Sequence, residues 1–198
     1  NKTVIIGGGA WGSAIAHQLR MNRDQDYTLL VRAPATAQNL KQGTVSQHPE
    51  LPKLPGFQVT TDPACLRDAD LVYLVVPVSA HDEMLALIDS YTSKKCAVIF
   101  CAKGLVADAD KGGIFLHEYA QRRLDGRPFA VFSGPSFADE VLKGLPTALL
   151  AASTRPHLSE TIAAQFTDSQ IRIYQGHDVT GAALGGAVKN VIAIATGI

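Results

Sequence analysis

The sequence predicts an α/β fold with a doubly wound, mostly parallel sheet. Two patterns in its 198 residues carry this prediction. Short apolar runs recur along the chain, and most are continuous rather than alternating, which is typical of strands covered on both faces. Helical patterns lie between these runs, and strands that alternate with helices form a parallel sheet with right-handed crossovers. We therefore expect one central sheet with helices on both faces.

The expected elements follow one another in regular order. The strands are predicted at residues 3–6, 27–31, 71–76, 97–100, 129–132, 147–152 and 171–174. The helices are predicted at residues 10–21, 35–42, 79–91, 111–124 and 157–167. A last helix begins near Asp178, a residue type that caps helix N-termini, and runs to the end of the chain. The polar, proline-containing segment 43–56 is expected to cover a sheet edge without taking part in chemistry.

The opening segment combines a strand, a glycine-rich turn and a helix. Gly7, Gly9 and Gly12 form a Gly-x-Gly-x-x-Gly pattern directly behind the apolar run 4–6. The first glycine permits a tight turn, the second lets the backbone approach a pyrophosphate, and the third lets the helix pack against the strand. The helix N-terminus would direct free N–H groups at the phosphates. The pattern predicts a Rossmann-like dinucleotide-binding domain, with a purely structural glycine turn as the alternative.

Composition excludes several classes of function. The 18 Lys and Arg residues balance 18 Asp and Glu residues, so no basic patch indicates a nucleic-acid partner. The apolar runs are strand-length, and we expect no membrane insertion and no secretory signal ahead of the first strand. Three cysteines and six histidines lack metal-ligand spacing. We therefore expect no metal site, and buried thiols in a cytoplasmic protein.

Two basic residues follow expected strands, where open α/β sheets bind their ligands. Arg32 lies 20 residues beyond Gly12, where an NAD-selective site usually places an acidic residue. Its cation instead suits a 2′-phosphate, which favours NADP with NAD tolerated. Lys103 follows the run 97–100 and could bind an anionic substrate or line the nicotinamide pocket. For both residues, a solvated surface side chain is the alternative.

Two further segments are candidates for chemistry. Ser136, with Asp139 three residues later, predicts a capping box that opens a short helix, whose N–H groups could also bind an anion. Lys189 is the only charged residue between positions 179 and 198, and small apolar residues surround it in the sequence. A poorly solvated lysine there is suited to exchange a proton, unless its side chain snorkels to solvent.

The apolar end of the chain, residues 191–198, is an unusual natural tail, because tails are usually polar. We therefore expect the sequence to be the front part of a longer enzyme. On this interpretation residues 1–177 form the dinucleotide-binding Rossmann domain. Residues 178–198 are then the first helix of a truncated, helical substrate domain.

Five stretches of the sequence resemble the N-terminal part of bacterial NAD(P)-dependent glycerol-3-phosphate dehydrogenases. They are Gly-Gly-Gly-Ala-Trp-Gly-Ser-Ala (7–14), Ala-Lys-Gly-Leu (102–105), Ser-Gly-Pro-Ser-Phe-Ala-Asp-Glu-Val (133–141), Gly-Leu-Pro-Thr-Ala (144–148) and Leu-Gly-Gly-Ala-Val-Lys-Asn-Val-Ile-Ala (184–193). They occur in the order found in that family and span nearly the whole chain. Many dehydrogenases share the first stretch, whereas the third and fifth are specific to the family.

The resemblance implies a reaction and a set of residue roles. The family reduces dihydroxyacetone phosphate to sn-glycerol 3-phosphate for phospholipid synthesis, and a homodimer of the complete enzyme is possible. Dinucleotide contacts would come from Ala10, Trp11, Arg32, Lys103 and Ala138. Substrate contacts would come from Lys103, Gly134, Ser136 and Lys189, of which Lys189 would be the proton donor and acceptor. Val78 departs from the family, which usually has serine there, so contacts near Pro77 stay open.

Two other functions remain open at this point. A related two-domain dehydrogenase could act on a hydroxyacid, a sugar acid or an acyl thioester, and it would share the glycine turn. The chain could also be a dinucleotide-binding module without turnover, since it lacks the rest of the family's substrate domain.

Overall fold

The computed structural model describes residues 1–22, 25–51 and 53–197, so residue 198 of the expected last helix lies outside the described residues. Its main sheet is built from β1 (Lys2–Ile6), β2 (Asp26–Leu30), β3 (Val59–Thr60), β4 (Leu71–Leu74), β5 (Ala97–Phe100), β8 (Phe129–Ser133), β9 (Thr147–Ala152) and β10 (Ile171–Gly176). The spatial order is β10-β9-β8-β5-β4-β1-β2-β3. All expected strands are confirmed, and the fold is Rossmann-like.

The sheet is parallel except at one junction. In its centre, Val4 of β1 pairs in parallel with Thr28 of β2 and with Val72 of β4. Among the described strand pairs of this sheet, only β9 runs against its neighbour β8, and β10 then runs parallel to β9. The carboxyl ends of β1, β2, β4, β5 and β8 therefore meet at one edge of the sheet, where a doubly wound fold places its ligands.

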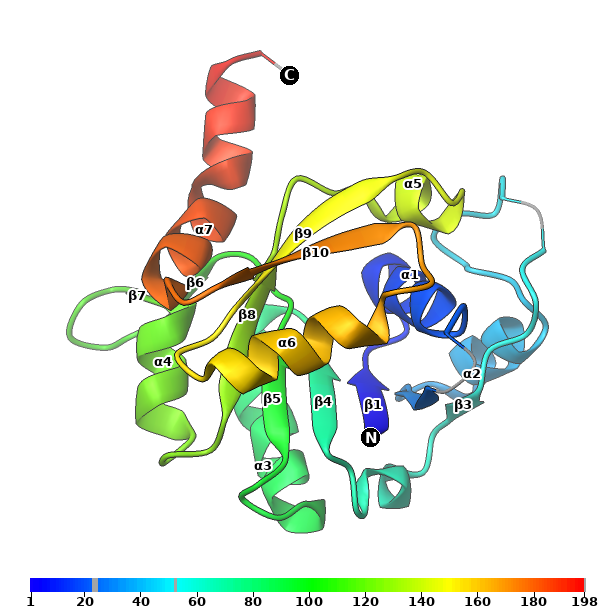
Figure 1. Cartoon of the computed structure of the whole chain (residues 1–198), viewed down its shortest axis with the longest axis horizontal. Coiled ribbons are helices and arrows are strands. Elements are labelled where there is room, and N and C mark those ends of the chain that lie inside the picture. Colours follow the sequence, from blue (N-terminus) through cyan, green and yellow to red (C-terminus); the bar gives the residue numbers. More distant parts are fainter. Residues whose placement is uncertain (23–24, 52, 198) are drawn as a thin grey trace.

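Helices cover both faces of the sheet (Figure 1). They are α1 (Ala10–Leu19), α2 (Pro34–Lys41), α3 (His81–Tyr91), α4 (Leu116–Arg123), α5 (Ala138–Leu142), α6 (Pro156–Gln165) and α7 (Val179–Ala195). Residues of α1, α2, α5 and α6 share one apolar core, and residues of α3, α4 and α7 share the other. Within β1, Ile5 faces the first core while Val4 and Ile6 face the second. Burial on both faces explains why the strands read as unbroken apolar runs.

One expected helix is partly wrong. Residues 111–124 were expected to form a single helix, but Ile114–Phe115 is a short strand, β7, that pairs antiparallel with β6 (Leu105–Val106). Gly112 adopts a left-handed φ of 71°, which interrupts a helix, and α4 begins only at Leu116. The Glu118 carboxylate accepts a hydrogen bond from the Phe115 N–H over 3.0 Å and satisfies that helix end.

Segment 43–56 leads into the edge strand β3, whose two residues gave too short a signal to predict. Val45, Leu51 and Leu54 from this segment pack against the core on the α1 and α2 side of the sheet. The segment therefore contributes apolar cover at the β2–β3 edge of the sheet.

The last helix begins as expected, because the Asp178 carboxylate accepts a hydrogen bond from the Gly181 N–H over 2.8 Å. Its later turns carry exposed apolar side chains, of which Ile194 is 78% exposed. None of the described helices combines the length and apolarity needed to cross a membrane. All three cysteines are free thiols; Cys96 and Cys101 are buried and Cys65 is half-buried.

Candidate functional site

The glycine turn connects β1 to α1 at the carboxyl edge of the sheet. Gly7 has a φ of 124°, which only glycine adopts readily, and its N–H donates to the Leu30 carbonyl over 3.0 Å. A Cβ on Gly7 would collide with the Val75 carbonyl, and one on Gly12 would collide with the Gly7 carbonyl. No described atom lies within 4 Å of a Cβ built on Gly9. Packing thus requires the outer two glycines, whereas the middle one borders open space.

The N-terminus of α1 has no side-chain cap. Gly9 is the N-cap residue, and its carbonyl accepts the Ser13 N–H over 3.0 Å. The first N–H groups of the helix, beginning at Ala10, therefore point outward with the positive end of the helix dipole. An open glycine cradle in front of an uncapped helix end fits a diphosphate.

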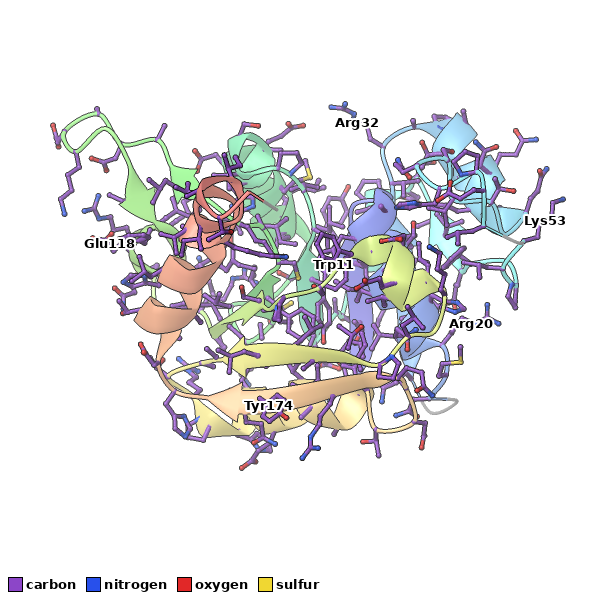
Figure 2. The ribbon with its side chains drawn as sticks, turned by 90° about the horizontal axis from the view of Figure 1, so that it is seen from above. Trp11, Arg20, Arg32, Lys53, Glu118 and Tyr174 are labelled. Atoms are coloured by element: carbon purple, nitrogen blue, oxygen red, sulfur yellow. The ribbon has the colours of Figure 1, made fainter. Side chains whose placement is uncertain are left out.

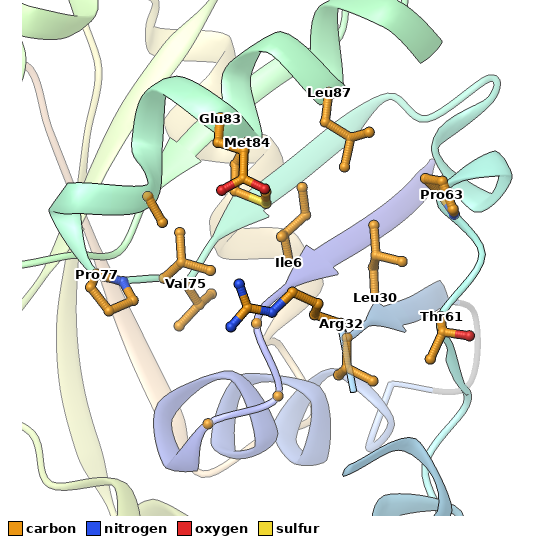
Figure 3. A pocket seen from close by; sticks show the side chains of 16 residues that line it. Ile6, Leu30, Arg32, Thr61, Pro63, Val75, Pro77, Glu83, Met84 and Leu87 are labelled. Carbon is orange, nitrogen blue, oxygen red and sulfur yellow. The ribbon is translucent and has the colours of Figure 1, made fainter. Parts of the chain in front are cut away.

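A cavity of about 500 Å³ lies beside the glycine turn, between the end of β2 and the start of α3 (Figure 3). Its walls are mostly apolar and include Ile6, Leu30, Val75, Met84 and Leu87. Of the described residues that line it, Arg32 and Glu83 carry charge. Arg32 comes from the segment after β2 and Glu83 from α3, and Figure 3 shows their charged groups turned toward one another across the cavity.

A second cavity of about 420 Å³ continues along the same sheet edge. It shares Val75, Val76 and Pro77 with the first cavity, and Trp11 and Lys103 line it as well. Figure 2 shows Trp11 in the middle of the molecule at the start of α1, with Arg32 at the rim. Val78, where the sequence departs from the family that it resembles, also lines the second cavity. Ala138 is half-buried at the start of α5 and packs against the core.

Two lysines converge next to this cavity. The Lys103 ammonium donates a hydrogen bond to the Gly134 carbonyl over 3.2 Å. Lys189 of α7 lies with its Nζ 4.8 Å from the centre of the Phe137 ring. Burial, and then the positive charge of Lys189 beside it, lowers the pKa of Lys103 to about 8. Two neighbouring, half-buried cations attract an anion.

Small residues let α7 approach this edge closely. A Cβ on Gly186 would lie 3.1 Å from the Ser133 hydroxyl and 3.8 Å from Cγ of Lys103. A Cβ on Gly134 would lie 2.8 Å from the Ala148 carbonyl. A third cavity, of about 520 Å³, opens between α7 and the end of β8, and Gly134, Gly186 and Lys189 line it. Among the glycines near Lys189, Gly186 therefore serves close approach of the helix, whereas a Cβ on Gly185 would meet no described atom within 4 Å.

The capping box expected at Ser136 is wrong. The N-cap residue of α5 is Phe137, and no side chain caps that helix. The Ser136 N–H bonds to the Gly134 carbonyl over 3.0 Å, and this tight turn delays the helix by one residue. Asp139 pairs with Lys143 over 3.1 Å instead. The Ser136 side chain is buried, and its hydroxyl lacks a hydrogen-bond partner within the described part of the chain, so it can serve a ligand.

Two residues of this region are not predictable as site residues from the sequence. Phe137 lies within a motif without a chemical signal of its own, although its ring lies under the Lys189 ammonium. Glu83 was overlooked because a glutamate in the first turn of a helix is ordinary, and nothing local signals a cavity. Across residues 1–22, 25–51 and 53–197, no group of three His, Cys, Asp or Glu side chains could hold a metal ion.

The fold and the site together define a Rossmann-like nucleotide-binding domain, with a glycine turn at the first strand and a lysine pair at the far end of the crevice. Residues 2–159 match the family model described as the NAD-dependent glycerol-3-phosphate dehydrogenase N-terminus. The chain belongs to this family.

Relatives support the same assignment. The chain is 37% identical over 198 residues to a glycerol-3-phosphate dehydrogenase [NAD(P)+] from Thioalkalivibrio sulfidiphilus, covering 98% of the chain and 58% of that protein. It is 38% identical to the protein of that name from Halorhodospira halophila, with the same shares covered. The crystal structure of the Coxiella burnetii glycerol-3-phosphate dehydrogenase superposes with a TM-score of 0.86 at 31% identity, covering 99% of this chain and 60% of that one. The chain thus spans less than two thirds of these relatives.

Proposed function

We propose that this chain is the coenzyme-binding part of an enzyme that interconverts dihydroxyacetone phosphate and sn-glycerol 3-phosphate with NADPH or NADH. The observation that carries the proposal is the lysine pair at the carboxyl edge of the sheet. Lys103 bonds to the Gly134 carbonyl over 3.2 Å, and Lys189 lies beside it and above Phe137. Lys103 lines the second cavity, which shares its wall with the cavity beside the glycine turn, and Lys189 lines the third cavity. A phosphorylated ketose supplies the anion such a pair favours.

Each region of the crevice binds one part of the coenzyme or of the substrate. The glycine turn and the N-terminus of α1 hold the diphosphate through Gly7, Gly9, Ala10 and Gly12, and Arg32 takes the adenosine end. Trp11 and Ala138 border the nicotinamide end. The bound, reduced nicotinamide supplies the hydride. Gly134, Ser136 and Lys103 hold the substrate phosphate and hydroxyl groups.

Lys189 is the proposed proton donor. Its ammonium bonds to the carbonyl oxygen of the ketose and protonates that oxygen as negative charge develops on it. General acid action of this kind is typically worth about 10² to 10⁴ in rate. Lys103 adds a second positive charge, and binding of a phosphate dianion relieves the repulsion between the two ammonium groups.

The order of domains is part of the proposal. Residues 1–177 form the coenzyme domain, and residues 178–198 begin a helical substrate domain. The exposed apolar side chains late in α7 support this division. The proposal extends to a homodimer of the complete protein, a cytoplasmic location and a role in phospholipid synthesis, all of which are consistent with the family.

The test measures turnover in the complete gene product that carries this chain. We expect oxidation of NADPH or NADH with dihydroxyacetone phosphate, and little with hydroxyacids or acyl thioesters. Lys189→Ala should lower kcat by at least about a hundredfold while leaving NADPH binding intact, and Lys143→Ala on the surface serves as the control. Near-normal turnover of Lys189→Ala would refute the assignment. Preference for another substrate class would favour a related dehydrogenase.

A further inference from the structure

Helix α3 presents an apolar stripe to the 500 Å³ cavity beside the glycine turn. Met84 and Leu87 of this helix, with Ala80 at its N-cap, recur at helical spacing and line the cavity. Glu83 lies on the same stripe and lines the cavity with them. Its neighbour Asp82 lies outside the cavity and accepts a hydrogen bond from the Tyr119 hydroxyl over 2.7 Å. The Glu83 carboxylate is therefore the charged group on a helix surface that is otherwise apolar and suited to contact a flat ring.

The Glu83 side chain has no ion pair or hydrogen bond with the described residues. Arg32 also has none, although the two charged groups face one another (Figure 3). The cavity is therefore positive on the β2 side and negative on the α3 side, with apolar walls between them. A ligand that complements these charges has an anionic or neutral group near Arg32. Near Glu83 it has a hydrogen-bond donor, because an ionised carboxylate only accepts hydrogen bonds.

We infer that Glu83 is a specificity-determining residue that selects the adenine base by accepting a hydrogen bond from its exocyclic amine. The inference rests on the proposed function, since the glycine turn must hold the diphosphate for the adenosine to enter this cavity. The ribose and any 2′-phosphate then lie toward Arg32. The base lies between the apolar walls, with its amine-bearing edge toward α3.

This assignment predicts discrimination between two coenzymes that differ in one group. Reduced nicotinamide hypoxanthine dinucleotide phosphate carries a carbonyl oxygen where NADPH carries the amine. At position 6 of the base two acceptors would face each other at Glu83, so the donor at that position is lost and a repulsion is added, and the N–H that hypoxanthine gains lies at N1. We expect the wild-type chain to bind NADPH about tenfold more tightly, the size of one charge-assisted hydrogen bond at a solvent-accessible site.

The experiment measures dissociation constants of both coenzymes for the chain and its variants. Trp11 is the single tryptophan and lines the neighbouring cavity, so energy transfer to the reduced nicotinamide reports both ligands equally. In Glu83→Gln the amide can accept from adenine or donate to hypoxanthine, and the preference should fall to within about twofold. Asp82→Asn removes a charge from the same helical turn outside the cavity, and it should keep the tenfold preference.

The outcomes separate the two proposals. Tight NADPH binding together with an unchanged preference in Glu83→Gln would overturn the role of Glu83 and leave the proposed function standing. Equal weakening of both coenzymes in Glu83→Gln would also overturn it, because Glu83 would then contact the ribose or only support the helix. Loss of preference in Asp82→Asn as well would assign the effect to helix charge. If the wild-type chain binds neither coenzyme, both proposals fail.

Discussion

The ammonium of Lys103 at the end of β5 donates a hydrogen bond to the carbonyl of Gly134 at the end of β8, over 3.2 Å. The two strands are neighbours in the sheet, so this bond ties together two loops that border the crevice. It also holds the long, flexible Lys103 side chain in one conformation in the free protein, so ligand binding costs less side-chain entropy. Lys103 is therefore positioned before an anion arrives.

Anion binding should depend on the protonation of Lys103. Its pKa of about 8 lies below the ordinary value of 10.5, because burial and the charge of Lys189 disfavour the ammonium. The affinity of the complete gene product for sn-glycerol 3-phosphate should therefore decrease as the pH rises above about 8. In Lys103→Arg the guanidinium stays charged, and this decrease should disappear. Isothermal calorimetry across the pH range checks both, and an equal decrease in the variant would contradict the assignment.

Folding stability should change in the opposite direction over the same range. The folded pKa of Lys103 lies below the unfolded value, so the unfolded chain binds more protons between about pH 8 and 10.5. The cost of burying the charged lysine is present in full below pH 8 and is relieved as the pH rises. Lys103→Met should remove this dependence in urea unfolding experiments, whereas the exposed Lys94→Met should retain it.

Two alanine substitutions in the glycine turn should separate packing from ligand binding. In Gly12→Ala the new Cβ collides with the Gly7 carbonyl, so unfolding should become easier by at least about 2 kcal/mol. In Gly9→Ala the Cβ enters open space, so stability should change by less than about 1 kcal/mol. The same methyl should abolish NADPH binding. Thermal unfolding and Trp11 fluorescence check the pair; a destabilised Gly9→Ala, or one that still binds, would contradict the geometry.

Arg32 should favour NADPH over NADH. It is exposed at the rim of the adenosine cavity and has no acidic partner among the described residues, so its charge is available to a 2′-phosphate. Arg32→Ala should weaken NADPH binding by about tenfold and NADH binding much less. Arg172→Ala serves as a matched control, because Arg172 lies over the Tyr174 ring on the distant edge strand. Equal losses for both coenzymes would contradict a phosphate contact.

His81 should make the fold less stable in mild acid. Its ring is buried against Phe100 and Tyr119, and burial lowers the pKa of His81 below 6.5, although a carbonyl and Asp82 partly offset this. The unfolded chain therefore binds the proton more readily, so stability is full above about pH 6.5 and decreases as the pH falls. The slope from one such group is at most about 1.4 kcal/mol per pH unit. His81→Phe should flatten the slope in denaturant titrations, whereas the exposed His157→Phe should not.

The sequence predicted the strands and most helices because continuous apolar runs report burial on two faces. It also predicted the glycine turn, where steric demands fall on single residues such as Gly7 and Gly12. The site residues were less predictable where helices from distant parts of the sequence meet. The cavity partner Glu83 and the ring of Phe137 beneath Lys189 depend on the relative placement of α3, α5 and α7, which no local pattern encodes. The helix expected at 111–124 failed because Gly112 and the pairing of β7 with β6 override local helical spacing.

The antiparallel junction of the main sheet, between β8 and β9, decides where Lys189 lies. Because β9 and β10 run the other way, the polypeptide leaves the sheet at the amino-terminal edge of the parallel strands, on the side away from the crevice. Helix α7 must then run back along β8, and the ten residue-to-residue rises from Val179 to Lys189 span about 15 Å. If β9 and β10 ran parallel to β8, β10 would end at the crevice. The helix that follows it would then run away from the crevice, and Lys189 would lie far from it. The reversed direction of β9 and β10 therefore lets α7 bring Lys189 back to the crevice.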